Sequence, residues 1–110
     1  MMNQTILLDR LADGILQFFM AQYAADEQLG EKTVLFSVVN GPTLHISDDS
    51  GAVSLHAILT QFALPDETLS LFEEKYLDII IALYRLLPEE GITDFTLDGD
   101  KTYICIIAKR

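Results

Sequence analysis

The strongest constraint on the fold is the stretch of residues 64–87, which is apolar on two sides at helical spacing. One apolar row recurs every three or four residues and comprises Leu69, Phe72, Tyr76, Ile80, Leu83 and Leu87. A second row lies beside it and comprises Leu77, Ile81 and Tyr84. Because one sheet can hardly cover both rows, such a helix is either enclosed by its own fold or uses one row for a partner. In so short a chain, a partner is favoured.

The start of this helix is indicated twice. Pro65, Asp66 and Glu67 suit a first turn, because proline needs no N–H there and carboxylates favour the positive end of the helix dipole. Ser70 followed by Glu73 has the spacing of a capping box, in which each side chain accepts a hydrogen bond from a backbone N–H that the helix leaves unpaired.

The length of 110 residues predicts a single domain, residues 1–110, because domains are commonly about 100–150 residues long. The longest apolar run, residues 79–84, is far shorter than the roughly 20 residues that cross a bilayer. Asp9 and Arg10 interrupt the only stretch that could be the core of a signal peptide. We therefore expect a cytoplasmic protein, and the single cysteine, Cys105, fits a reducing compartment.

The chain is strongly acidic, with seven Lys and Arg against seventeen Asp and Glu and a net charge of −10. Residues 66–100 contain ten acids against only Lys75 and Arg85, a local charge of −8. Such a field repels nucleic acid and anionic membranes and steers a basic protein toward the surface. An acidic surface that only keeps the domain soluble explains the same charge.

The rest of the chain predicts one more helix and five strands. Residues 3–25 form an amphipathic pattern of helical period. The predicted strands, which turn signals such as Asn40-Gly41 and Asp98-Gly99-Asp100 separate, are residues 33–39, 42–47, 52–59, 92–97 and 102–108. The order α-β-β-β-α-β-β predicts an α+β domain with a mainly antiparallel sheet packed against helices.

We expect no catalytic, cofactor or metal site. His45 and His56 would share one face of adjacent strands, but no third metal ligand accompanies them. Cys105 lies mid-strand between two isoleucines, where burial keeps a thiol inert. The adjacent pairs Glu73-Glu74 and Glu89-Glu90 do not face one another across a site. The chain is therefore predicted not to be an enzyme.

Three segments resemble the small acidic chaperones of type III secretion effectors. The segment LLDRLADGI (residues 7–15) is similar to the first helix of that family. The segment TLHISDDSGAVSLHAIL (residues 43–59) is similar to its second and third strands, and ALPDE (residues 63–67) resembles the proline and acidic residues that follow these strands. The resemblance implies a homodimer that pairs through the helix after the third strand. It also implies that an extended effector segment binds to apolar patches of the first helix and the sheet.

Under this resemblance, two sets of residues receive roles. The dimer contact would comprise Leu69, Phe72, Tyr76, Ile80, Leu83 and Tyr84. The client would contact Leu11, Ile15, Phe18, Phe36 and Val38.

The alternative is an immunity protein, a small acidic inhibitor that neutralises a basic toxin such as a nuclease. Complementary charge would speed its association with the toxin. The toxin-binding residues would then be Glu73, Glu74, Asp78, Glu89, Glu90 and Asp94. A structural subunit of a larger complex, which would also use the second apolar row, is a third interpretation.

Overall fold

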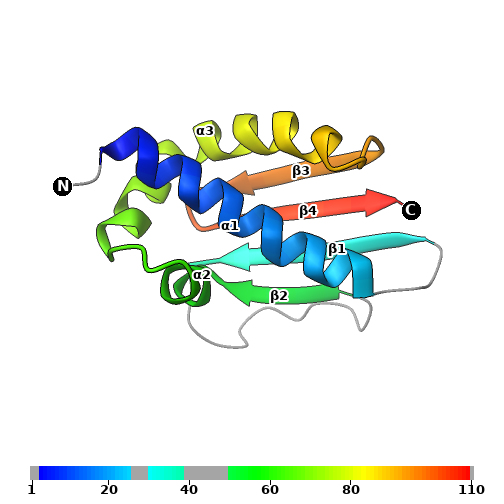
Figure 1. Ribbon diagram of the computed structural model, residues 1–110, viewed down its shortest axis with the longest axis horizontal. Coiled ribbons are helices and arrows are strands. Elements are labelled where there is room, and N and C mark those ends of the chain that lie inside the picture. Colours follow the sequence, from blue (N-terminus) through cyan, green and yellow to red (C-terminus); the bar gives the residue numbers. More distant parts are fainter. Residues whose placement is uncertain (1–2, 26–29, 39–49, 110) are drawn as a thin grey trace.

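A computed structural model describes residues 3–25, 30–38 and 50–109 of the chain. The elements follow one another as α1 (Gln4–Ala25), β1 (Glu31–Ser37), β2 (Ser50–Ser54), α2 (Leu55–Gln61), α3 (Glu67–Glu89), β3 (Phe95–Asp100) and β4 (Tyr103–Lys109). They form one α+β unit, as the sequence predicts (Figure 1).

The four strands form one mixed sheet in the order β2-β1-β4-β3. β1 pairs with β4 and β4 with β3 in antiparallel fashion, which confirms the mainly antiparallel prediction. β2, however, runs parallel to β1, with Phe36 opposite Val53. Antiparallel strands can be joined by a short turn, whereas parallel strands need a longer connection.

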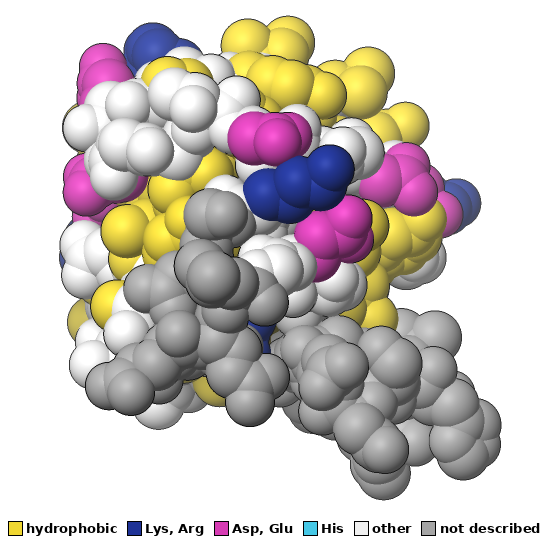
Figure 2. Space-filling model, turned by 90° about the vertical axis from the view of Figure 1, so that its right-hand side faces the viewer, with side chains coloured by type: hydrophobic (Ala, Val, Ile, Leu, Met, Phe, Trp, Pro, Cys, Tyr) yellow, Lys and Arg dark blue, Asp and Glu magenta, His cyan; other side chains and the backbone are white. Residues whose placement is uncertain are grey.

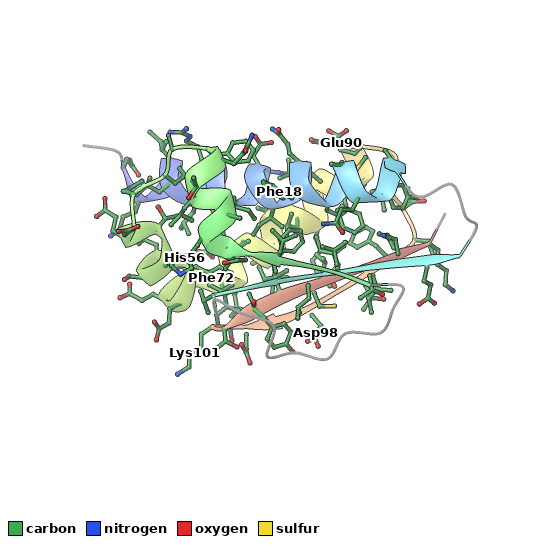
Figure 3. All side chains as sticks on the ribbon, turned by 90° about the horizontal axis from the view of Figure 1, so that it is seen from below. Phe18, His56, Phe72, Glu90, Asp98 and Lys101 are labelled. Atoms are coloured by element: carbon green, nitrogen blue, oxygen red, sulfur yellow. The ribbon has the colours of Figure 1, made fainter. Side chains whose placement is uncertain are left out.

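All three helices lie on one side of the sheet, and α3 lies along the edge that β3 forms (Figures 1 and 3). The core fills the space between the two layers. One of its rows crosses three strands, because Val34 is opposite Ile106 and Ile106 is opposite Leu97. These three side chains are buried, whereas Leu35 and Cys105 alternate onto the other face and are half-buried.

The largest correction to the sequence prediction concerns residues 55–59, which are not part of a strand. They belong to α2, and Ser54 is the N-cap residue: its hydroxyl accepts a hydrogen bond from the backbone N–H of His56. The buried side chains Leu55, Ile58 and Leu59 follow the spacing i, i+3, i+4. This helical period was present in the sequence, but the turn signal of residues 48–51 favoured a strand after it.

α2 and α3 both end in the arrangement known as the Schellman motif. At the end of α3, the N–H of Ile92 donates to the carbonyl of Leu87, and the N–H of Gly91 donates to the carbonyl of Pro88. Gly91 has the positive φ (+87°) that the motif requires. α3 therefore continues through Pro88 to Glu89, two residues beyond the predicted end. At the end of α2, Ala63 occupies the equivalent position with φ +53°. 

Two further contacts fix α1 against its neighbours. A guanidinium N–H of Arg10 donates to the carbonyl of Phe62, the C-cap residue of α2, at 2.8 Å. Gly14 lies where α2 crosses α1, and both Ile58 and Phe62 come within contact distance of the place where a Cβ would be. The absence of a side chain at Gly14 permits this close approach of α2.

The start of α3 differs from the prediction. The helix begins at Glu67, so Ser70 lies inside it and the capping box that was predicted from Ser70 and Glu73 is wrong. Lys75 has non-helical backbone angles (φ −131°, ψ 32°), which divide α3 into two segments. 

The last two strands are shifted along the chain by one to three residues. β3 continues through Asp98 and Gly99, and the turn lies at Lys101 and Thr102 instead. The Asp100 carboxylate accepts hydrogen bonds from the N–H and the hydroxyl of Thr102, and these bonds lower the pKa of Asp100. The predicted strand 42–47 and the Asn40-Gly41 hairpin lie outside the described residues.

Candidate protein-binding surface

The second segment of α3 is apolar on two sides, and only one of them is used by the chain's own core. Ile79, Leu83 and Leu87 face inward and are buried. Three large side chains face outward at i, i+4 and i+7 with high exposure: Leu77 (58%), Ile81 (66%) and Tyr84 (50%). We call these three residues the outer stripe.

The outer stripe stands out from the rest of the surface. Within the described residues, only one other large hydrophobic side chain, Ile6 on α1, is exposed to this degree. Figure 2 shows hydrophobic side chains gathered along the top of the molecule, where α3 lies. Single exposed hydrophobic residues are ordinary, but a row of three on one helix face is typical of an interaction surface.

Phe95 on β3 extends the apolar surface beyond the helix. Its ring lies 5.5 Å from that of Tyr84, centroid to centroid, with the planes tilted by 45°. Phe95 is half-buried and belongs to the strand at the edge of the sheet. The apolar surface thus reaches from α3 to the edge of the sheet.

The predicted dimer residues divide into three groups. Phe72 and Leu83 are fully buried in the chain's own core, so their assignment to a dimer contact is wrong. Leu69, Tyr76 and Ile80 are half-buried against that core, and Tyr84 is exposed. The sequence indicates both rows, but the predicted dimer contact drew mainly on the row that the chain's own core uses. Leu77 and Ile81, which the predicted contact does not include, belong to the exposed row.

The predicted client residues divide into two groups, one buried and one half-buried. Leu11, Ile15 and Phe36 are fully buried, so they offer no surface to a client. Phe18 and Val38 are half-buried, and each lines a different surface hollow.

The hollow at Phe18 lies between α1 and α2 and has a volume of about 300 Å³. Its apolar wall is formed by Phe18 and Phe62, whose ring centroids lie 6.4 Å apart. Phe18 lies on the side of α1 that faces the end of α2 (Figure 3). The hollow at Val38, of about 280 Å³, also includes Leu69 and Glu73 and lies near the β3–β4 turn. Phe62 was not identified from the sequence, because residues 55–62 were not expected to form a helix that packs on α1.

All six predicted acidic residues are exposed. They form two groups, with Glu73, Glu74 and Asp78 near the kink of α3 and Glu89, Glu90 and Asp94 at its far end. Asp78 and Glu89 are eleven residues apart, or about 16 Å along a helix axis. 

The side chains that could act as metal ligands or nucleophiles do not form a site in the described part of the chain. His56 lies on α2 instead of a strand, and its predicted neighbour His45 is outside the described residues. Burial and the nearby Asp98 carboxylate raise the pKa of the Cys105 thiol, which disfavours the nucleophilic thiolate. Among the described residues, no group of three or more His, Cys, Asp and Glu side chains could hold a metal ion.

Within the same residues, each helix is too short or too polar to cross a membrane. Comparisons of the chain with models of protein families, with curated proteins and with solved structures find no match in any of the three. Function is therefore inferred from the surface alone.

Proposed function

We propose that the chain is a non-catalytic protein-binding domain that works as a homodimer in the cytoplasm and, like the chaperones of type III secretion effectors, holds an extended segment of a client protein. The observation that carries the proposal is the outer stripe. Three large apolar side chains stay half or more exposed, whereas Ile79, Leu83 and Leu87 on the opposite side of the same helix segment are buried. A second copy would remove this surface from water.

The exposed area sets only the gross contribution of burial to the homodimer. Fully burying a large apolar side chain contributes about 1.5–3 kcal/mol, so a half-exposed one contributes about 1 kcal/mol. Six such side chains across two copies give roughly 6 kcal/mol, which is offset by an association cost of about 4–15 kcal/mol. We therefore expect a weak homodimer, and the mass in solution should be measured up to about 1 mM protein.

The hollow between α1 and α2 is the better of the two candidate client sites. Its two aromatic side chains come from different helices, and a half-exposed aromatic pair can receive an apolar side chain of an extended segment. It lies between α1 and α2, and no residue of α3 lines it, so one chain can use both surfaces at once.

Light scattering on a sizing column tests the homodimer. Wild-type protein should shift from monomer to dimer as its concentration rises, and both Ile81→Glu and Tyr84→Glu should remain folded monomers. Tyr76→Glu, at a half-buried position against the core, is expected to lower stability as well. A wild-type monomer at every concentration would refute the homodimer.

The client is tested separately. The chain is co-expressed with the amino-terminal segments of secreted proteins that neighbouring genes encode, and binding is measured with purified pairs. Phe18→Gln should weaken binding of the client while leaving the mass of the dimer unchanged. If none of these segments binds, or if binding does not respond to Phe18→Gln, the chaperone-like proposal fails even where the dimer exists.

An inhibitor of a basic toxin is the second candidate, and the exposure of all six acidic side chains favours it. Charge reversal of Glu73 and Glu74 to Lys tests it without touching the outer stripe. An electrostatic inhibitor would lose inhibition of a basic nuclease and associate more slowly with it. Unchanged inhibition would exclude this mode of binding.

A further inference from the structure

We infer that two copies of this chain pair through antiparallel α3 helices, with Asp78 of each copy next to Arg85 of the other. This inference rests on the proposed homodimer and specifies its geometry. It is drawn from the spacing of the outer stripe and from the charges that flank it.

The outer stripe has the spacing of a coiled-coil seam. Leu77, Ile81 and Tyr84 are separated by steps of four and three residues, and Pro88, which is also exposed, follows after four more. These are the steps between positions d, a, d and a of a heptad. All four residues belong to the segment of α3 after the irregular Lys75, so one continuous segment carries the seam.

Only one flank of the seam is free for a partner. On one side, Ile80 is half-buried and Leu87 is buried in the chain's own core. On the other side lie Asp78 and Arg85, which are seven residues apart, at the two e positions, and exposed; Asp78 also lines the hollow that α3 forms with the start of α1. The free flank therefore carries one negative and one positive charge.

These charges select the antiparallel orientation. Two antiparallel helices place the e flank of one against the e flank of the other, whereas parallel helices place e against g. In the antiparallel register that packs Ile81 on the second copy's Tyr84, Leu77 packs on the second copy's Pro88 and Asp78 lies beside the second copy's Arg85. The two-fold axis repeats each contact. A parallel pair would instead direct the charges toward Ile80 and Leu87, which face the core of their own chain.

Charge exchange tests this register. Each of the single variants Asp78→Arg and Arg85→Asp places like charges together twice in the dimer. Because two exposed ion pairs are then replaced by two repulsive pairs, each variant should raise the dissociation constant about tenfold. The double variant exchanges the charges and should return to within about threefold of the wild type. Glu73→Arg makes the same change of charge elsewhere on α3 and serves as the control.

Cross-linking provides a second test that does not depend on affinity. In a Cys105→Ser background, Leu77→Cys chains should not cross-link to one another on mild oxidation, because in the antiparallel register their Cα atoms are about 16 Å apart along the helix axis. They should cross-link when mixed with Pro88→Cys chains. Cross-linking of Leu77→Cys to itself indicates parallel helices and overturns the inference.

The outcomes separate the register from the homodimer itself. A wild-type monomer removes both. A dimer that Ile81→Glu splits, but that the double charge exchange does not restore, leaves the homodimer intact and refutes the register. Circular dichroism of each variant confirms that these exposed substitutions leave the helices folded.

Discussion

Gly14 on α1 lies directly beneath Ile58 on α2: a Cβ at position 14 would be only 2.7 Å from the Cγ2 atom of Ile58. This close approach holds α2 against the first helix and positions Phe62 beside Phe18. A glycine in the middle of a helix lowers helix stability by about 1 kcal/mol relative to alanine, so the contact offsets a local cost.

Gly14→Ala should therefore destabilise the protein although alanine favours helix. Overpacking costs about 1–3 kcal/mol, which exceeds the gain in helix propensity of about 1 kcal/mol. Urea denaturation should show the loss. The same change in an Ile58→Leu background should cost less, because leucine has no Cγ2 branch at that place. A more stable Gly14→Ala protein would contradict the close contact.

The two rows of α3 should respond differently to truncation. Phe72→Ala removes a fully buried ring and should lower the free energy of unfolding by about 3–5 kcal/mol. Ile81→Ala, in the outer stripe, should change the stability of the monomer by less than about 0.5 kcal/mol while weakening the dimer. Denaturation at low protein concentration, where the monomer dominates, measures the free energy of unfolding of both variants. Equal losses would mean that the outer stripe is part of the core.

Thr68 offers a stabilising substitution. This residue is fully buried in the first turn of α3, and within the described residues its hydroxyl has no hydrogen-bond partner. Because an unpaired buried hydroxyl costs about 1–3 kcal/mol, Thr68→Val should raise the melting temperature. Thr60→Val is the matched control, since the Thr60 hydroxyl is exposed and donates to the carbonyl of His56. A melting temperature that falls in both variants would indicate that Thr68 has a partner.

Alkylation of Cys105 should depend on pH in a defined direction. Burial, and after it the charge of Asp98 on the neighbouring strand, raise the pKa of the thiol. The protonated form is therefore favoured in the fold. Any stabilisation from this group is complete below the ordinary thiol pKa and is lost as the pH rises through the raised value.

Iodoacetamide should accordingly react with folded protein more slowly than with unfolded protein at pH 8, and the difference should narrow at higher pH. Asp98→Asn removes one of the two causes and should raise the rate at a fixed pH. Cys105→Ser gives the background, because the chain has no other cysteine. A slower reaction in Asp98→Asn would contradict the electrostatic cause.

Much of the fold could be predicted from local patterns. The amphipathic period of residues 3–25, the long apolar helix and the turn signals between strands placed five of the seven described elements within about three residues of their observed bounds, namely α1, β1, α3, β3 and β4. The α2 helix was missed although Ser54 and the spacing of Leu55, Ile58 and Leu59 indicate it. A short apolar segment fits both the period of a helix and that of a buried strand. Its packing on Gly14, which lies about forty residues earlier in the chain, favours the helix.

The sequence by itself determined that α3 has two apolar rows and that acidic side chains surround them, because the period of a helix fixes which residues share a face. Only the tertiary structure decided which row is free. The row with Phe72 and Leu83 is covered by α1 and the sheet, and the row with Leu77, Ile81 and Tyr84 is not. That choice depends on the rotation of the helix about its own axis when it docks, and this rotation follows from contacts between segments far apart in the chain.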